Sequence, residues 1–211
     1  RDDIRFSSRL NPAEDATYLA AAEKGDAKSA QRMVDSAAKK AGYSSKELFH
    51  GTDKDKTFTV FDLDRGGEVT GHPQARVGFY FTQDRDFAGS YPTSMPAGSG
   101  KSIPVRLRLQ NPKRIPINVF YDSLPRSAGL AAGDAFREDL IRQGHDGIIL
   151  TAATIKDMHP TTEVGVHIAF DPTQIKSTDP ITRDDSGAII PLSERFNPER
   201  DDIRFSSRLT P

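Results

Sequence analysis

Two short apolar runs, Glu47–Thr52 and Gly78–Thr82, organise the pattern of hydrophobic and polar positions along the chain. Each run places a hydrogen-bonding or aromatic residue among residues that favour strands, and each ends in small or polar residues. This pattern predicts two β-strands whose ends face one cleft. Because successive side chains of a strand point to opposite faces, we expect Phe79 and Phe81 in the core and Tyr80 in the cleft.

Further strands are predicted where apolar residues alternate with polar ones or form short runs bounded by turn residues. Ile103–Leu109 alternates apolar residues with arginines and predicts a half-exposed strand. Asp146–Leu150 predicts a buried strand, and Val164–Phe170 predicts the last strand. Phe58–Phe61 predicts a short strand, and the loop Asp62–Gln74 after it is rich in glycine and charge.

Helical periodicity appears in three parts of the chain. Apolar residues recur at helical spacing over Tyr18–Ala41 with an interruption at Gly25, which predicts an amphipathic helical hairpin or one kinked helix. Asp84–Tyr91 predicts a short helix, and Leu130–Gln143 predicts a longer one closed by Gly144 in a left-handed conformation. Helices and strands in this order predict an α+β fold.

The two ends of the chain carry the same ten residues. Arg1–Leu10 and Arg200–Leu209 both read RDDIRFSSRL, which chance does not explain. The repeat is too short, too charged and too restricted to the boundaries to belong to a solenoid. It is either a duplicated linker or a recognition sequence at which a processing protease releases the intervening module. The second interpretation is favoured because the repeat brackets the whole domain.

These features divide the chain into three parts. Residues 1–12 are expected to be a repeat or linker segment, and residues 13–178 the folded domain. Residues 179–211 lack periodicity and are expected to form a flexible tail that carries the second copy of the repeat. The chain begins with Arg1 rather than Met, so we expect a fragment or a processed product.

Composition narrows the classes of function. A chain of 211 residues with 36% hydrophobic residues fits one globular domain with polar appendages. A net charge of −1 gives no electrostatic reason to bind nucleic acid or an anionic membrane. No apolar run approaches the roughly 20 residues that span a bilayer, and no signal peptide is visible.

A metal site is not expected. Cysteine is absent, which excludes disulfides and thiolate ligands. The histidines other than His50 show no mutual spacing typical of a metal site. These are His72, His145, His159 and His167.

The residues of the two organising strands resemble a known signature. His50-Gly51-Thr52, Tyr80 within Gly-Phe-Tyr-Phe, and Tyr91 eleven positions later resemble the nicotinamide-binding signature of ADP-ribosyltransferases of the diphtheria-toxin and poly(ADP-ribose) polymerase type. More closely, the arrangement resembles the ADP-ribosyltransferase domains of polyvalent proteins of phages and conjugative elements. The resemblance runs from about residue 18 to residue 177 and implies a split, mostly antiparallel sheet with N-terminal helices around an NAD cleft.

The chemistry of NAD explains why a site for it would need these residue types. Cleavage of its bond to the cationic nicotinamide passes through an oxocarbenium-like sugar. Tyr80 and Tyr91 can stack on the pyridinium ring, a contact worth about 1–2 kcal/mol when desolvated. Gly51 lets backbone groups approach the carboxamide, and a neutral His50 can bond a ribose hydroxyl. The expected NAD-binding residues are His50, Gly51, Thr52, Tyr80, Phe81 and Tyr91.

The last strand departs from the family pattern. The segment Phe170–Ser177 matches relatives in which a catalytic glutamate stands five positions before the Asp, and here that position is Val166. The nearest carboxylate, Glu163, lies on the opposite face of a regular strand, and a bulge at Gly165 could restore it. The expected catalytic residues are therefore His50, Tyr80 and Glu163.

The resemblance implies a mono-ADP-ribosyltransferase, because enzymes of this fold with an apolar residue at that place transfer single ADP-ribose units, and Val166 argues against chain elongation. NAD would be the substrate, no metal would be needed, and the acceptor would be a macromolecule, protein rather than nucleic acid. The expected setting is a toxin or effector module of a larger phage or mobile-element polyprotein, in the cytoplasm of a bacterial host. The alternatives are an NAD glycohydrolase and a non-catalytic NAD-binding or structural module.

Overall fold

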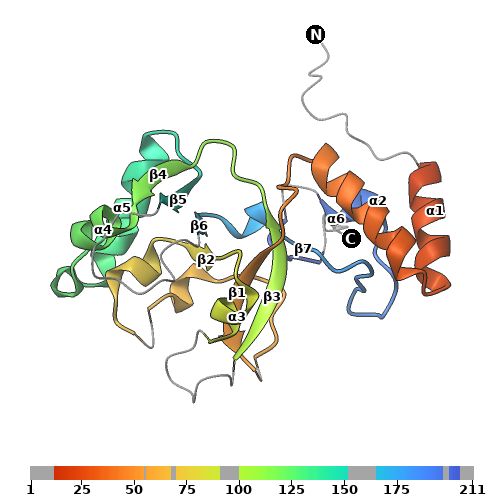
Figure 1. Cartoon of the computed structure of the whole chain (residues 1–211), viewed down its shortest axis with the longest axis horizontal. Coiled ribbons are helices and arrows are strands. Elements are labelled where there is room, and N and C mark those ends of the chain that lie inside the picture. The colour runs from red at the N-terminus through yellow and green to blue at the C-terminus, as the bar shows by residue number, and fades with distance from the viewer. Residues whose placement is uncertain are drawn as a thin grey trace, which may run out of the picture.

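The computed structural model describes residues 12–54, 56–67, 70–90, 100–151, 165–196 and 200–204. The helices are α1 (Pro12–Glu23), α2 (Ala27–Lys40), α3 (Arg85–Ser90), α4 (Ile117–Ser123), α5 (Leu130–Arg142) and α6 (Leu192–Arg195). The strands are β1 (Leu48–Asp53), β2 (Phe79–Phe81), β3 (Gly100–Leu107), β4 (Lys113–Pro116), β5 (Gly147–Thr151), β6 (Val166–Ala169) and β7 (Ile175–Ser177). Figure 1 shows the strands at the centre and left of the molecule and a layer of α1, α2 and α6 at the right.

These strands form two sheets that meet at one point. The first sheet has the order β1-β3-β7 and the second the order β2-β6-β5-β4. All neighbours are antiparallel except β4 and β5, which are parallel. A single bridge between Phe49 of β1 and Thr82, just after β2, joins the sheets. The predicted α+β fold with a split, mostly antiparallel sheet is thus confirmed.

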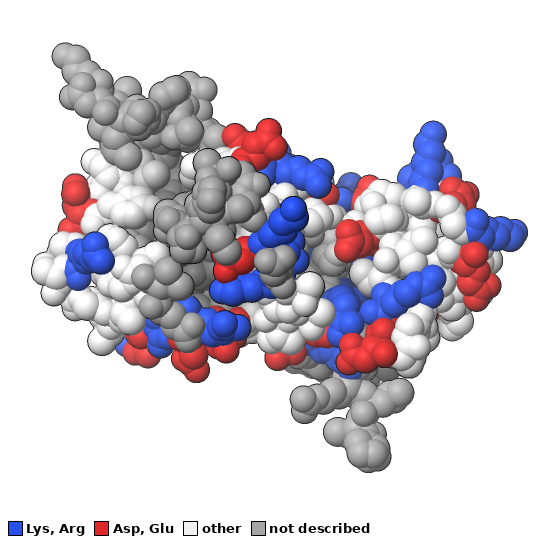
Figure 2. Space-filling model, turned by 90° about the horizontal axis from the view of Figure 1, so that it is seen from below, with Lys and Arg blue, Asp and Glu red and all other residues white. Residues whose placement is uncertain are grey.

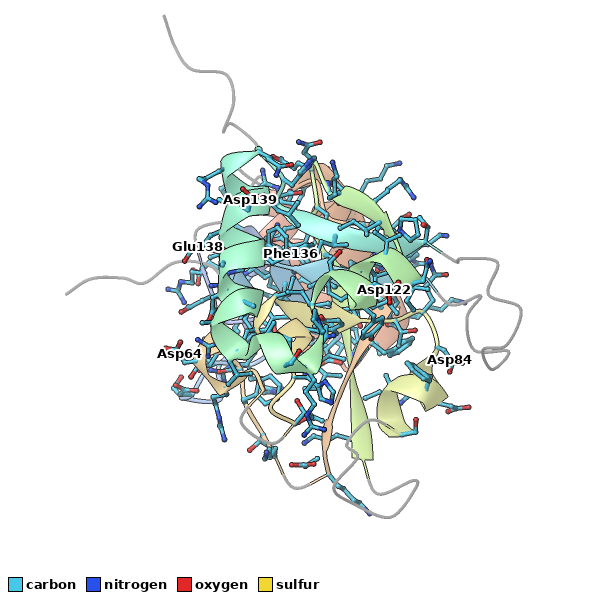
Figure 3. The ribbon with its side chains drawn as sticks, turned by 90° about the vertical axis from the view of Figure 1, so that its left-hand side faces the viewer. Asp64, Asp84, Asp122, Phe136, Glu138 and Asp139 are labelled. Atoms are coloured by element: carbon cyan, nitrogen blue, oxygen red, sulfur yellow. The ribbon has the colours of Figure 1, made fainter. Side chains whose placement is uncertain are left out.

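Helices cover the second sheet on one face. Phe120 of α4 and Leu140 of α5 pack against Ile148 of β5 and Ile168 of β6 in one apolar cluster. Figure 3 shows Phe136 of α5 over the middle of this layer, with Glu138 at its outer edge. This division of apolar and charged positions is the amphipathic pattern expected of a helix lying on a sheet.

The N-terminal helices form the predicted hairpin. Gly25 adopts a φ of +72° between them, a left-handed conformation that glycine tolerates best. The carboxylate of Asp26 accepts the N–H of Ser29 and caps α2. The buried faces of α1 and α2 pack against residues near the C-terminus, including Leu192 and Phe196.

The segment after β7, which the sequence predicts as a flexible tail, contains buried residues in its described parts, 179–196 and 200–204. Ile190, Leu192 and Phe196 are buried, and so is Arg195. The Arg195 guanidinium donates to the Tyr18 hydroxyl and to backbone carbonyls of residues 179 and 180. The sequence lacks periodicity here because these residues pack through isolated turns rather than through one long element.

Two predicted strands differ from the structure. Phe58–Phe61 forms only a single bridge, between Val60 and Asp202. In β3, Arg106 is 7% exposed rather than facing solvent. Its guanidinium lies 2.6 Å from a carboxylate oxygen of Asp35 and also donates to the carbonyl of Ser44. Because α2 supplies a partner on that face, the alternation of arginine with apolar residues does not mark an exposed face.

The described surface carries both signs of charge. Figure 2 shows Lys and Arg interspersed with Asp and Glu on the face seen from below. This mixture agrees with the net charge of −1. Among the described residues, no helix combines the length and the apolar character that a bilayer crossing requires.

Candidate functional site

The candidate site lies where β1 and β2 separate. The Phe49 N–H donates to the Thr82 carbonyl at 2.8 Å, and the Thr82 N–H donates to the Phe49 carbonyl at 3.0 Å. In a regular antiparallel ladder, the next such pair would join Gly51 and Tyr80. The strands part before that pair forms, because Phe49 and Thr82 make only an isolated bridge.

The register of β1 directs the backbone groups of Gly51 into this gap. Backbone groups of alternate residues in a strand point to the same side, so Gly51 faces the side of β2, as Phe49 does. Pro104 of β3 lies opposite Phe49, which fits because a proline has no N–H to contribute to that pair. On the side that faces β2, the N–H and C=O of Gly51 form no backbone hydrogen bond with the described residues.

His50 takes the place of the missing pair. Its Nδ1 lies 2.9 Å from the carbonyl oxygen of Tyr80. Since a carbonyl can only accept, Nδ1 carries the proton and Nε2 keeps its lone pair. The imidazole therefore donates a hydrogen bond to the Tyr80 carbonyl in the split and leaves Nε2 as an acceptor.

Three phenylalanine rings surround this imidazole. The ring centres of Phe58, Phe61 and Phe81 lie 6.2, 4.8 and 5.6 Å from that of His50. Burial lowers the pKa of His50 from its ordinary value of 6.5. The side chain is therefore neutral at pH 7, as a hydrogen-bond acceptor for a hydroxyl must be.

Tyr80 lies on the predicted face but does not share a pocket wall with the His50 ring. Its side chain packs with Val166 and Ile168, on the face of β2 opposite Phe79 and Phe81. Its hydroxyl donates to the Gln74 carbonyl at 2.6 Å. The structure thus brings the His50 imidazole to the Tyr80 backbone rather than to its ring.

Two other expected NAD-binding residues are more deeply placed. Phe81 is 1% exposed, so its ring supports His50 from the core. Contact between Phe81 and NAD stays a prediction. Thr52 is also buried and lies opposite Lys101 in the ladder between β1 and β3.

Val166 occupies the place on β6 expected from the sequence. It pairs with Leu150 of β5, and its partly buried side chain packs in the same cluster as Tyr80. Because Ile168 pairs with Tyr80, Val166 lies one two-residue step along the same face. An apolar side chain therefore stands where the related families place a carboxylate. Tyr91 and Glu163 lie outside the described residues.

Helix α3 covers the other face of β1 at this point. The Asp84 carboxylate accepts the N–H groups of Asp86 and Phe87, both at 2.9 Å, and so fixes the start of the helix. The Arg85 guanidinium lies 6.0 Å from the centre of the Phe49 ring. The aspartate before a helix is a sequence signal for such a cap.

The ring contacts of Phe58 and Phe61 with His50 have no local sequence signal. They arise because the loop after β1 folds back on the strand, which periodicity cannot reveal. These two residues are the part of the site that the strand prediction missed.

No metal site appears among the described residues, where no three potential ligand side chains lie together. Figure 3 shows Asp64, Asp84 and Asp122 spread apart rather than converging. Hollows of about 150 and 520 Å³ lie elsewhere, lined by groups that include Gln174 and Leu19 respectively. The candidate site is therefore defined by the hydrogen-bonding groups in the split.

Comparison with known proteins agrees with this geometry. A family model described as "ADP-Ribosyltransferase in polyvalent proteins" matches residues 39–182. The match includes every strand named above and the positions of His50, Gly51, Tyr80 and Val166. No curated protein and no solved structure matches the chain. The chain therefore belongs to the family of ADP-ribosyltransferases in polyvalent proteins.

Proposed function

We propose that the protein is a mono-ADP-ribosyltransferase that uses NAD to modify a macromolecular acceptor. The observation that carries this proposal is the missing pair between β1 and β2, which leaves the N–H and C=O of Gly51 directed into the split. Family membership supports transferase chemistry of this type.

The nicotinamide carboxamide complements Gly51. It has one acceptor and two donor hydrogens, so it can accept from the Gly51 N–H and donate to the Gly51 C=O. Such a pairing repeats the pattern of an antiparallel strand pair. The absence of a side chain at position 51 allows a flat ring to lie close to the backbone.

The nicotinamide ribose would lie beside His50. The Nε2 atom is an acceptor because Nδ1 is committed to Tyr80, and it can accept the proton of a ribose hydroxyl. The phenylalanine rings around the imidazole keep it neutral and fixed in orientation. A fixed acceptor holds the sugar while its bond to the departing base breaks.

The reaction breaks the C1′–N bond of NAD, and the bonding electrons leave with neutral nicotinamide. The oxocarbenium-like sugar then takes an electron pair from an acceptor nucleophile, which loses its proton to a base or to water. Val166 provides no base in the cluster around Tyr80. A hydroxyl of ADP-ribose is therefore not activated there, which supports transfer of one unit rather than a chain. We propose Glu163 as the carboxylate that stabilises the sugar.

A protein is the acceptor that the charge distribution favours. The mixed charges in Figure 2 and the net charge of −1 provide no field that would gather a polyanion. We also propose that the chain acts as an effector module of a larger phage or mobile-element polyprotein in the bacterial cytoplasm, in keeping with its family.

Val166 favours a second candidate, a non-catalytic module that retains the fold for NAD binding or structural purposes. The absence of a carboxylate at this position lowers the electrostatic stabilisation available to the sugar cation. Binding of NAD without turnover would then be the function.

Incubation of the protein with host lysate and NAD labelled in the adenylate part separates these candidates. Labelled protein in the lysate supports transfer, and digestion to single ADP-ribose units on peptides supports the mono form. Release of nicotinamide without labelled macromolecules indicates NAD hydrolysis. Binding with neither product indicates the non-catalytic module. A nuclease-treated lysate is the control that distinguishes protein from nucleic acid as the acceptor.

A further inference from the structure

The part of the second repeat copy that the structure describes, residues 200–204, packs on the folded domain. We call residues Arg200–Arg204 the strap. The Ile203 N–H donates to the Thr59 carbonyl at 2.7 Å, and the Ile203 carbonyl accepts the Ser177 N–H at 2.9 Å. Asp202 forms a bridge with Val60. The strap thus fills a groove between the outer edge of β7 and the segment at residues 59–60.

Side chains fix the strap in this groove. Ile203 is 7% exposed and packs in the cluster that contains Phe61 and Phe81. Lys176 of β7 is 0% exposed, and its ammonium donates to the Arg200 carbonyl at 2.7 Å and to the Asp202 carbonyl at 3.1 Å. The groove therefore combines two backbone edges, an apolar hole and a buried cation.

The strap also bonds to the turn before α6. The Arg204 guanidinium lies 2.9 Å from a carboxylate oxygen of Asp202 and 2.9 Å from one of Asp185. The Thr182 hydroxyl lies 3.5 Å from the Arg204 carbonyl. These contacts place the end of the strap, Arg204, beside residues 182–185.

The contacts of the strap belong to a sequence that the chain contains twice. Arg1, Asp3, Ile4 and Arg5 repeat Arg200, Asp202, Ile203 and Arg204 in the same order and spacing. We propose that the groove is a receptor for this sequence, and that Arg1–Leu10 of a second copy of the chain can replace the strap and link two molecules. Since the exchanged residues are identical, the exchange preserves each contact and differs only in chain connectivity, as in domain swapping.

The position of α1 favours a second molecule over the chain's own first copy. The strap leaves the groove toward Arg183, which lines a hollow together with Leu19 and Glu23 near the end of α1. The first copy of the same chain must instead join α1 at Pro12, so the residues between Arg5 and Pro12 would have to run back along the length of α1, about 18 Å. In Figure 1, α2 also lies between α1 and β7. A copy from another molecule is free of this restraint.

Cysteine cross-linking tests the proposal in the full chain, which has no cysteine of its own. One chain carries Asp3→Cys and the other Val60→Cys, and both carry Ile203→Glu to weaken the resident strap. We expect a disulfide-linked heterodimer on non-reducing gels. The positive control is one chain with Asp202→Cys and Val60→Cys, because bridged residues lie within the span of a disulfide.

Adding Ile4→Glu to the Asp3→Cys chain should reduce the heterodimer about tenfold, because a charge replaces the residue that fills the apolar hole. If the heterodimer yield is the same with and without Ile4→Glu, the proposal is overturned. A disulfide that forms only when Asp3→Cys and Val60→Cys stand in one chain would assign the groove to the chain's own first copy and would also overturn it. The same two chains with Ile203 retained should form the heterodimer more slowly, because the resident strap still fills the groove. If circular dichroism shows that the Ile203→Glu chains are unfolded, this second pair decides, and the absence of a heterodimer from it counts against exchange.

Discussion

The two nitrogens of His50 have separate tasks. Nδ1 bonds the Tyr80 carbonyl that would otherwise pair with Gly51, and Nε2 is left as an acceptor at the split. A substitution that keeps only the hydrogen bond made by Nδ1 can therefore separate the effect on stability from the effect on NAD affinity.

His50→Asn is expected to keep the fold and to bind NAD more weakly. The asparagine amide can donate to Tyr80 in place of Nδ1, but it has no counterpart of Nε2. Loss of one hydrogen bond should weaken NAD binding about tenfold, as measured by calorimetry. His50→Ala should in addition lower the free energy of unfolding by about 1–3 kcal/mol, because the buried hydrogen bond to the Tyr80 carbonyl is lost. Wild-type NAD affinity in His50→Asn would exclude Nε2 from the site.

Val166→Glu is expected to raise the rate of nicotinamide release at least tenfold, roughly the 1.4 kcal/mol that a nearby negative charge readily supplies to a sugar cation. The partly buried side chain packs beside Tyr80, so a longer residue can extend along that face. Val166→Gln has nearly the same shape without the charge and should leave the rate unchanged. Chromatography of released nicotinamide measures both, and equal rates in the two variants would show that this position does not face the sugar.

The sequence predicts some of these residues better than others. Alternation placed Tyr80 opposite Phe79 and Phe81, because the period of a strand depends only on neighbours in the chain. It could not predict that the Tyr80 hydroxyl bonds Gln74, or that Phe58 lies against His50, since both contacts depend on how loops fold back.

At the scale of elements, the approach of β2 to β6 depends on a glycine. A Cβ at Gly78 would lie 2.4 Å from the Ala169 carbonyl oxygen. This position explains why the run Gly-Phe-Tyr-Phe begins with glycine: the backbone of β6 occupies the space of a side chain.

Gly78→Ala should lower the free energy of unfolding by about 1–3 kcal/mol, because two backbones must separate to admit the methyl group. Gly89→Ala is the matched control, since a Cβ there meets nothing within 4 Å. In α3 this second change should stabilise by up to about 1 kcal/mol. Urea unfolding compares the two, and equal effects would contradict the close packing of β2 on β6.

Lys176 should make stability depend on pH. Burial lowers its pKa from 10.5 to about 8. Between these values the unfolded chain holds a proton that the folded chain has lost, so this group stabilises the fold as pH rises. The gain is about 3 kcal/mol between pH 8 and 10.5. Lys176→Met should lack it, which pH-dependent urea unfolding of both proteins would show. Parallel stability curves would contradict the burial of this ammonium beside the strap.

The long periodic helices were predicted, and so was the three-residue strand β2, whereas the equally short β7 was missed. The hairpin of α1 and α2 has enough turns for its period to show, and Gly144 adopts the predicted left-handed φ of +87° after α5. All three residues of β7 are buried, including Lys176 and Ser177, so its polar residues do not mark an exposed face. Its place is set by pairing with β3 and by the strap, both distant in sequence.

At the scale of the whole molecule, a layer is added to the family core. The family match covers residues 39–182, whereas α1, most of α2 and α6 lie outside it. The apolar faces of these helices are buried against one another, through Tyr18, Val34 and Phe196. The division into a linker, a domain and a tail stays a prediction, but α1, α2 and α6 pack as one layer.

The strap is expected to influence the site from outside it. Thr59 bonds Ile203, and its neighbour Phe58 lies against His50. Ile203→Ala should lower the free energy of unfolding by about 2–4 kcal/mol and weaken NAD binding several-fold. Ile141→Ala, at a side chain that is 50% exposed, should change neither. Calorimetry with NAD tests this link, and an Ile203→Ala protein that is less stable but binds NAD normally would break it.

Processing at the repeats stays a proposal, and the docked strap gives it a condition. With Ile203 buried, a protease needs the strap released before it can bind the second copy. Mapping the termini of a longer precursor, with and without Ile203→Glu, tests whether release governs cleavage.

The clustering of Leu192 and Phe196 with α1 and α2 has a consequence for synthesis on the ribosome. Helices α1 and α2 expose Tyr18 and Val34 until Leu192 and Phe196, more than 150 residues later, have been translated. At translation speeds of about 5–20 residues per second, that interval lasts on the order of ten seconds or more. During this time the nascent helices need either a chaperone or rapid burial against the partly formed sheet.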